Sequence, residues 1–136
     1  MYFNDKLQRI SIGGKELPVK IDMFVLEEIQ EKYGTIHEFE LKIKGFKESR
    51  KEDGKVYLEK VPESIGAINL VLPMMVREGC DIEGIDLDMS DKDIVRSVDV
   101  PYPELLKIVI DEFDKCFKTQ KKETPSKKES TKKLVR

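Results

Sequence analysis

The stretch "SIGAINLVLPMMVREG", residues 64–79, is apolar on almost every side of the helix that its length and composition predict. A helix without a polar face is normally buried at the centre of its fold. Pro73 should kink this helix, because proline lacks a backbone N–H and crowds the carbonyl four residues earlier. We expect the helix to end at Gly79 and the rest of the chain to pack around it.

Residues 7–22 are predicted to form a β-hairpin. Apolar residues alternate with other residues on both sides of Gly13-Gly14, at Ile10, Ile12, Leu17, Val19 and Ile21. The two glycines supply the positive φ angles that a two-residue hairpin turn requires. Pro18 cannot donate a hydrogen bond, so its strand should lie at a sheet edge.

Residues 22–45 have the pattern of two short helices joined at a corner. Asp22 is a candidate N-cap, and Gly34 suits the left-handed residue that follows a last helical turn. Thr35 and Glu38 then have the spacing of a capping box, which starts a second helix that ends at Gly45. The only histidine, His37, lies among these capping residues, so a surface position is favoured over a role in acid–base catalysis.

The segment from 46 to 61 is polar and rich in turn residues around Asp53-Gly54. We favour a flexible loop with a short strand; the alternative is a second hairpin with Val56 and Leu58 on one face. Beyond the central helix, Ser90 is a candidate N-cap for a short helix that reaches Val98. The final amphipathic helix has an apolar stripe made of Leu105, Leu106, Val109, Ile110, Phe113 and Phe117.

These patterns predict one α+β domain, mostly α-helical, over residues 1–117. It has an N-terminal β-hairpin followed by about five helices. Residues 118–136 contain eight Lys or Arg and two Glu, a net charge of +6, which leaves −8 on the rest of the chain. Such a composition predicts a disordered basic tail on an acidic domain.

Few residues in the sequence suggest catalytic or metal chemistry. His37, Cys80 and Cys116 are too few for a structural zinc site, and the acidic stretch 81–93 lacks the residue order of a calcium loop. The glycine-rich phosphate-binding motifs and the nucleophile elbow are also missing from the sequence. We therefore expect a protein without metal or cofactor that is not an enzyme, with its two cysteines reduced.

No apolar run approaches the roughly 20 residues of a membrane helix. The N-terminus also lacks a secretory signal, so we expect no membrane partner and a cytoplasmic location. The basic tail has no aromatic residue for base stacking, and the acidic domain would repel a phosphate backbone. Nucleic acid is thus an improbable partner, although Lys121 and Lys122 are candidates for an electrostatic contact with an acidic protein.

The order of four stretches resembles a known family. They are "VKIDMF" (19–24), "LEEIQEKYGTIHEF" (26–39), "MVREG" (75–79) and "MSDKDIVRSVD" (89–99). Over about residues 7–117 the chain is similar to the tail assembly chaperones of long-tailed bacteriophages and prophages. The resemblance implies a non-enzymatic factor of the bacterial cytoplasm, which coats the helices of the tape measure protein, recruits tail tube subunits and leaves before the tail is complete.

A chaperone of this kind needs apolar surface for its client, and helix-in-groove recognition would supply it. The candidate contact residues are Phe24 and Val25 in the first helix and Leu105 and Val109 in the last. The alternative is that these faces only pack on one another. Self-association is compatible with this role. Two other functions stay open: a head–tail connector or tail completion protein of the virion, and a small nucleic-acid-binding regulator that uses the tail.

Overall fold

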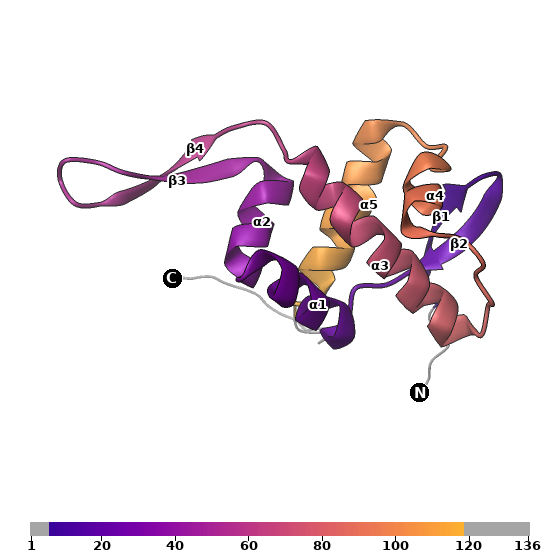
Figure 1. The fold of residues 1–136 in the computed structure, drawn as a ribbon. Coiled ribbons are helices and arrows are strands. Elements are labelled where there is room, and N and C mark those ends of the chain that lie inside the picture. Colours follow the sequence, from indigo (N-terminus) through magenta and orange to yellow (C-terminus); the bar gives the residue numbers. More distant parts are fainter. Residues whose placement is uncertain (1–5, 119–136) are drawn as a thin grey trace, which may run out of the picture.

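The computed structural model describes residues 6–118, and this part of the chain has the predicted α+β architecture with five helices. Helix α3 runs through the middle of the molecule, and the other helices and the first hairpin surround it (Figure 1). The elements in order are β1 (Gln8–Ile12), β2 (Lys15–Val19), α1 (Met23–Tyr33), α2 (Ile36–Lys44), β3 (Phe46–Arg50), β4 (Val56–Lys60), α3 (Ile65–Glu83), α4 (Asp91–Arg96) and α5 (Tyr102–Lys115). The predicted basic tail lies outside the described residues, apart from Lys118.

Helix α3 is the buried centre that its apolar composition predicts. Ser64 caps its N-terminus, where the hydroxyl accepts a hydrogen bond from the N–H of Ala67 at 3.1 Å. The predicted end at Gly79 is wrong, because the helix continues to Glu83 and is followed by Gly84, which has a φ of 74°. Gly79 is buried instead beneath β2, where a Cβ atom would lie 2.7 Å from the backbone nitrogen of Val19.

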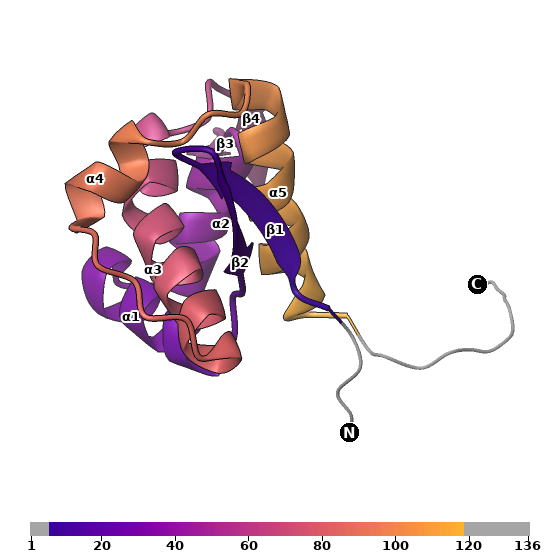
Figure 2. The same ribbon diagram turned by 90° about the vertical axis from the view of Figure 1, so that its right-hand side faces the viewer.

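The N-terminal hairpin is confirmed. Strands β1 and β2 pair antiparallel with Ile10 opposite Leu17, around a Gly13-Gly14 turn with φ angles of 58° and 81°. The hairpin lies across α3 with β1 beside α5 (Figure 2). The N–H of Lys20 donates to the carbonyl of Met75 at 3.1 Å, so the chain leaving β2 is hydrogen-bonded directly to α3.

The predicted corner between two helices is also confirmed. The Asp22 carboxylate accepts hydrogen bonds from the first-turn N–H groups of α1 at 3.1 and 3.2 Å. The Thr35 hydroxyl accepts from the N–H of Glu38 at 2.9 Å at the start of α2. Gly34 and Gly45 follow the two helices with φ angles of 94° and 81°. Side-chain caps and glycines therefore set both helix boundaries.

Residues 46–60 form the second hairpin rather than the flexible loop that we favoured. Strands β3 and β4 pair antiparallel with Glu48 opposite Leu58, and the hairpin projects away from the helices (Figure 1). The Asp53 carboxylate holds the turn, because it accepts from the N–H of Lys55 at 2.9 Å and from the hydroxyl of Tyr57 at 2.6 Å. Local turn chemistry thus orders a segment that has little buried surface.

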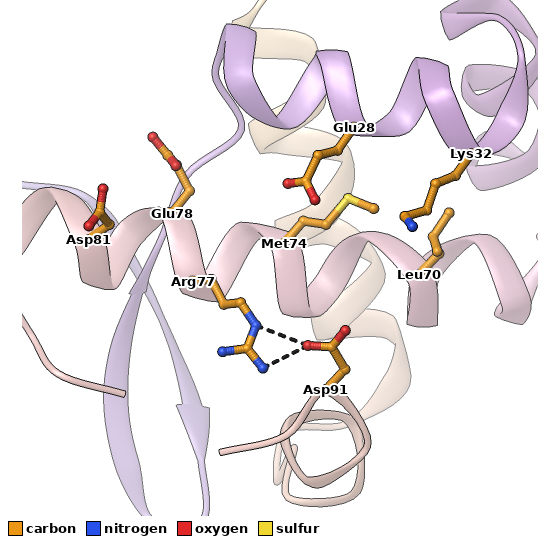
Figure 3. Close-up of a pocket in the computed structure, with 8 residues that line it drawn as sticks. All are labelled: Glu28, Lys32, Leu70, Met74, Arg77, Glu78, Asp81 and Asp91. Carbon is orange, nitrogen blue, oxygen red and sulfur yellow. Dashed lines mark hydrogen bonds and ion pairs between the residues drawn. The ribbon is translucent and has the colours of Figure 1, made fainter. Parts of the chain in front are cut away.

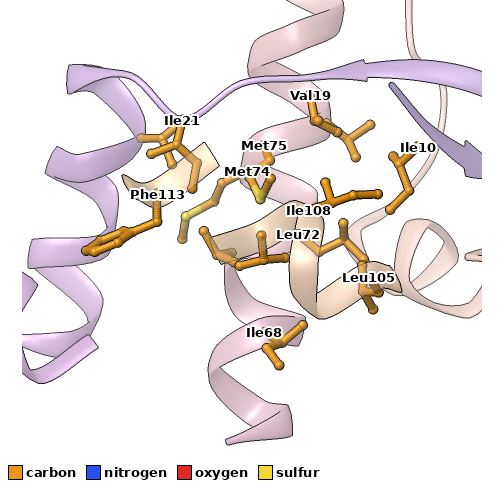
Figure 4. Close-up of a cluster of buried hydrophobic side chains, with 14 of the residues drawn as sticks. Ile10, Val19, Ile21, Ile68, Leu72, Met74, Met75, Leu105, Ile108 and Phe113 are labelled. Carbon is orange, nitrogen blue, oxygen red and sulfur yellow. The ribbon is translucent and has the colours of Figure 1, made fainter. Parts of the chain in front are cut away.

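Helices α4 and α5 complete the core. Helix α4 ends at Arg96, two residues before the predicted end, because Val98 instead forms a β-bridge with Ile12. In α5 the buried face includes Ile108 and Glu112 beside the predicted stripe, whereas Phe117 lies beyond the helix and is exposed. Side chains from β1, β2, α3 and α5 meet in one apolar cluster (Figure 4).

Candidate functional site

The most exposed large apolar side chains of the described chain gather where α1 begins and α5 ends. Met23 is 76% exposed, Phe24 70% and Phe117 59%. Met23 and Phe117 line a hollow of about 340 Å³, which we term the α1–α5 hollow, whereas the adjacent Phe24 lies outside its lining. Its lining residues are Met23, Leu26, Glu27, Gln30, Ile36, Cys116 and Phe117. Contiguous exposed apolar surface of this kind marks binding sites on soluble proteins.

The geometry of α1 keeps two of these side chains out of the core. Val25, Leu26 and Ile29 are the buried residues of the helix. Met23 and Phe24 lie on other sides of the helix than this buried stripe and therefore face away from the core. The Asp22 cap fixes the backbone at this point, since it binds the N–H of Phe24 itself. The exposed pair thus stands on an ordered helix terminus.

Phe117 is held by aromatic packing. Its ring centroid lies 5.1 Å from that of Phe113, which is buried and lies 5.7 Å from the centroid of Phe39. The thiol of Cys116 donates to the carbonyl of Ile21 at 3.2 Å, which joins the end of α5 to the chain before α1. Burial raises the pKa of the Cys116 thiol, which favours its protonated form.

The structure separates the predicted contact residues. Phe24 lies on the exposed surface, as a partner-binding residue must. Val25, Leu105 and Val109 are buried in the core, so their assignment to a docking surface is corrected: they pack against this chain's own helices. Lys121 and Lys122 lie outside the described residues, although Lys118 directly follows Phe117 at this end of the molecule.

Three residues of this surface were not predicted from the sequence: Met23, Ile36 and Phe117. A signal for Met23 existed, because Met23, Phe24, Val25 and Leu26 are four consecutive apolar residues. An amphipathic helix of this width cannot turn all four toward one core. The sequence pattern places Phe117 in the apolar stripe of the last helix. Because that helix ends at Lys115, Phe117 instead lies outside the core.

A second depression, the polar groove, lies between α1, α3 and α4 (Figure 3). It has a volume of about 500 Å³ and is lined by Glu28, Lys32, Leu70, Met74, Arg77, Glu78, Asp81 and Asp91. Arg77 fixes one wall: its Nε and Nη2 donate to the same oxygen of Asp91 at 2.9 and 2.7 Å, and Nη2 also donates to the carbonyl of Met89. The arginine thereby fastens α4 to α3.

Glu78 has a raised pKa in this groove. A hydrogen bond with Asp22, burial, and the negative charges of Asp22, Asp81 and Glu28 raise its pKa to about 7. A carboxyl group that exchanges its proton near neutral pH is suited to acid–base work in principle. The described residues that line the groove include no serine, cysteine or histidine to act with it. A pKa of about 7 makes Glu78 partly protonated near neutral pH.

His37 is a surface residue, as predicted. Its Nε2 lies 2.8 Å from a carboxylate oxygen of Glu48, so the ring joins α2 to the projecting hairpin. The hydrogen bond to the Glu48 carboxylate raises the pKa of His37, and the negative charges of Glu40 and Glu38 act in the same direction. Within residues 6–118, no three His, Cys, Asp or Glu side chains are grouped to hold a metal ion.

Over the described part of the chain, none of the helices has both the length and the apolar character needed to cross a bilayer. Compared with known protein families, with curated proteins and with solved structures, the chain has no significant match.

Proposed function

We propose that the chain is a phage tail assembly chaperone, and that the α1–α5 hollow docks apolar helix faces of the tape measure protein. The proposal rests on one observation above all: Met23, Phe24 and Phe117 are presented to solvent by a well-packed core. The order of sequence stretches that resembles such chaperones supplies the identity of the client. Like these chaperones, the protein works without enzymatic chemistry in the bacterial cytoplasm.

The hollow suits an amphipathic client helix. Such a helix presents apolar residues at positions i, i+3, i+4 and i+7, and an apolar groove bounded by polar residues accepts them. Here the polar boundary is formed by Glu27 and Gln30 of α1. Met23 adds adaptability, because its unbranched thioether can repack against different client side chains. Each fully covered apolar side chain stabilises the complex by about 1.5–3 kcal/mol before ordering costs.

Charge supports the same role. Residues 6–118 contain 24 acidic and 18 basic residues, a net charge of −6. An acidic exterior keeps a complex dissolved while its apolar surface is occupied, and it disfavours contact with a phosphate backbone. In this proposal the tail tube subunits are the second partner, and the chaperone is absent from the mature virion.

Co-expression with the tape measure protein of the same phage tests the proposal. The wild-type chain should increase the soluble yield of the client, because it covers apolar helix faces that otherwise aggregate. The Met23→Ser/Phe24→Ser/Phe117→Ser variant should lose this effect. A matched control is Ile65→Ser/Ile82→Ser, which also removes exposed apolar side chains, but from the two ends of α3.

Equal yields from wild type and the triple variant would contradict docking at the hollow. Abundant peptides from residues 1–117 in purified tails would instead identify a connector or tail completion protein. Salt-dependent DNA binding that disappears on removal of residues 118–136 would support the nucleic-acid regulator.

A further inference from the structure

The hairpin β3–β4, which we term the arm, extends away from the rest of the molecule. Along its outer half, none of the described helices covers it (Figure 1). Every residue of β4 is exposed, including Val56, Tyr57 and Leu58. An isolated two-stranded hairpin is marginally stable at best in water. A surface that packs on the arm would therefore stabilise it.

The two faces of the arm differ. Tyr57 and Glu59 point to one face, where the Tyr57 hydroxyl donates to Asp53 at 2.6 Å and Lys47 lies 3.9 Å from Glu59. Val56 and Leu58 point to the opposite face, because side chains alternate along a strand. Their cross-strand partners are Arg50 and Glu48, which share that face. We term this second surface the Val56–Leu58 face.

We propose that the Val56–Leu58 face binds the same face of a second copy of this chain about a two-fold axis. The charges on this face indicate that its partner is a second copy of the same face. The two-fold axis runs perpendicular to the strands and parallel to the face, midway between the Glu48–Leu58 pair and the Arg50–Val56 pair. This places Leu58 against Val56 of the second copy. Glu48 then meets Arg50 of the second copy, and the symmetry repeats both contacts. The face is complementary to itself.

Neighbouring groups leave both charges available for this contact. Glu48 accepts from His37 through one carboxylate oxygen at 2.8 Å, and its second oxygen can accept from an arginine. Arg50 donates to the carbonyl of Gly54 at 3.1 Å through Nη1 only, which leaves further guanidinium donors free. Because the overlapping surface is small, we expect a weak dimer with a dissociation constant on the order of 100 µM.

Sedimentation equilibrium of the full chain between about 10 µM and 1 mM tests the apolar part of the contact. Val56→Thr/Leu58→Thr keeps residues that favour strands and should weaken dimerisation at least about tenfold. Glu59→Thr is the matched control on the opposite face of the same strand and should leave the dissociation constant unchanged. A wild-type chain that stays monomeric at 1 mM, or an equal loss in the control, would overturn the proposal.

Charge exchange tests the two-fold arrangement itself. Arg50→Glu places acidic residues at both charged positions of the contact and Glu48→Arg places basic residues at both, so each variant alone should dimerise about tenfold more weakly than wild type. An equimolar mixture of the two should form a heterodimer at least as tight as the wild-type dimer. The double variant Glu48→Arg/Arg50→Glu should dimerise like wild type, since the pattern is complementary again. Failure of the mixture to associate would refute the two-fold contact.

Dimerisation through the arm is independent of the proposed function. The arm and the α1–α5 hollow consist of different residues, and sedimentation requires no client. Client solubilisation could fail while dimerisation persists, and the reverse result is equally distinguishable.

Discussion

Replacement of Gly79 by alanine tests the contact that fixes the hairpin β1–β2 to the central helix. In an ordinary helix interior, alanine is more stable than glycine by about 0.5–1 kcal/mol. Gly79, however, is buried against the backbone of β2, and an added Cβ would lie 2.7 Å from the nitrogen of Val19 and closer still to the Pro18 carbonyl group. We therefore predict that Gly79→Ala is destabilising, opposite in sign to the helix propensity.

The size of the effect follows from what must move. The nearest neighbours of the new carbon are backbone atoms, which cannot rotate away, so the strand has to withdraw from α3 by roughly 0.5–1 Å. This movement strains the hydrogen bond from Lys20 to Met75, now 3.1 Å, and loosens the packing of Val19 in the core. Overpacking and a weakened buried hydrogen bond together cost about 2–4 kcal/mol.

Urea denaturation followed by far-UV circular dichroism measures the free energy of unfolding of both proteins. The matched control is Gly66→Ala in the same helix, where the nearest neighbouring atom is the Ser64 Oγ at 3.8 Å from the added Cβ. The control should be stabilised by about 0.5 kcal/mol, because the site has room. If Gly79→Ala were as stable as wild type or more so, β2 would not lie against the backbone of α3 as described.

Three further predictions concern Glu78, Thr35 and the first helix. The pKa of Glu78 is raised to about 7, so the folded state holds a proton that the unfolded state releases near pH 4.5, and stability falls as the pH rises between these values. Glu78→Gln should therefore stabilise the protein by about 1 kcal/mol at pH 8, allowing for solvent screening, and by much less at pH 5, measured by urea titration at both pH values. Thr35→Ala should cost about 1 kcal/mol in thermal unfolding because it removes the cap at 2.9 Å, whereas Thr35→Ser should retain most of it; equal losses would exclude the hydroxyl as the cause. Phe24→Ser should change the free energy of unfolding by less than about 0.5 kcal/mol, whereas the buried Val25→Ser should lose about 2 kcal/mol or more; the reverse order would contradict the described orientation of α1.

Local signals predicted the helix boundaries well where the chemistry is local. Asp22, Thr35 and Ser90 cap the helices that follow them, and Gly45 ends α2, because these effects depend on atoms a few residues apart. Gly79 illustrates the limit. The same residue type that ends a helix elsewhere is required here by the approach of β2, a segment about sixty positions earlier in the sequence.

The arm was harder to predict because the alternation of apolar and polar residues is clear only in strands that have one buried face. Val56 and Leu58 alternate with polar residues, but every residue of β4 is exposed, so the pattern is weak. The turn chemistry around Asp53 was present in the sequence and supports the hairpin. Its strength could not be judged without the pairing partners.

The candidate surface was predicted only in part for a related reason. An apolar stripe shows that a helix face will be covered, but it does not distinguish this chain's own core from another protein. Val25 and Val109 turned out to face the core, whereas Phe24 faces solvent. The distinction depends on the rotation of each helix about its axis, which tertiary packing decides.

Site-specific photo-crosslinking at the α1–α5 hollow shows directly whether a client helix docks there. The full chain, with Met23 replaced by p-benzoylphenylalanine, is co-expressed with the tape measure protein and irradiated, and a chain with the same replacement at Ile82 serves as the matched exposed position. We predict a crosslinked product with the tape measure protein from position 23 and little or none from position 82. Equal crosslinking from both positions, or none from position 23 in a complex that can be purified, would contradict docking at the hollow.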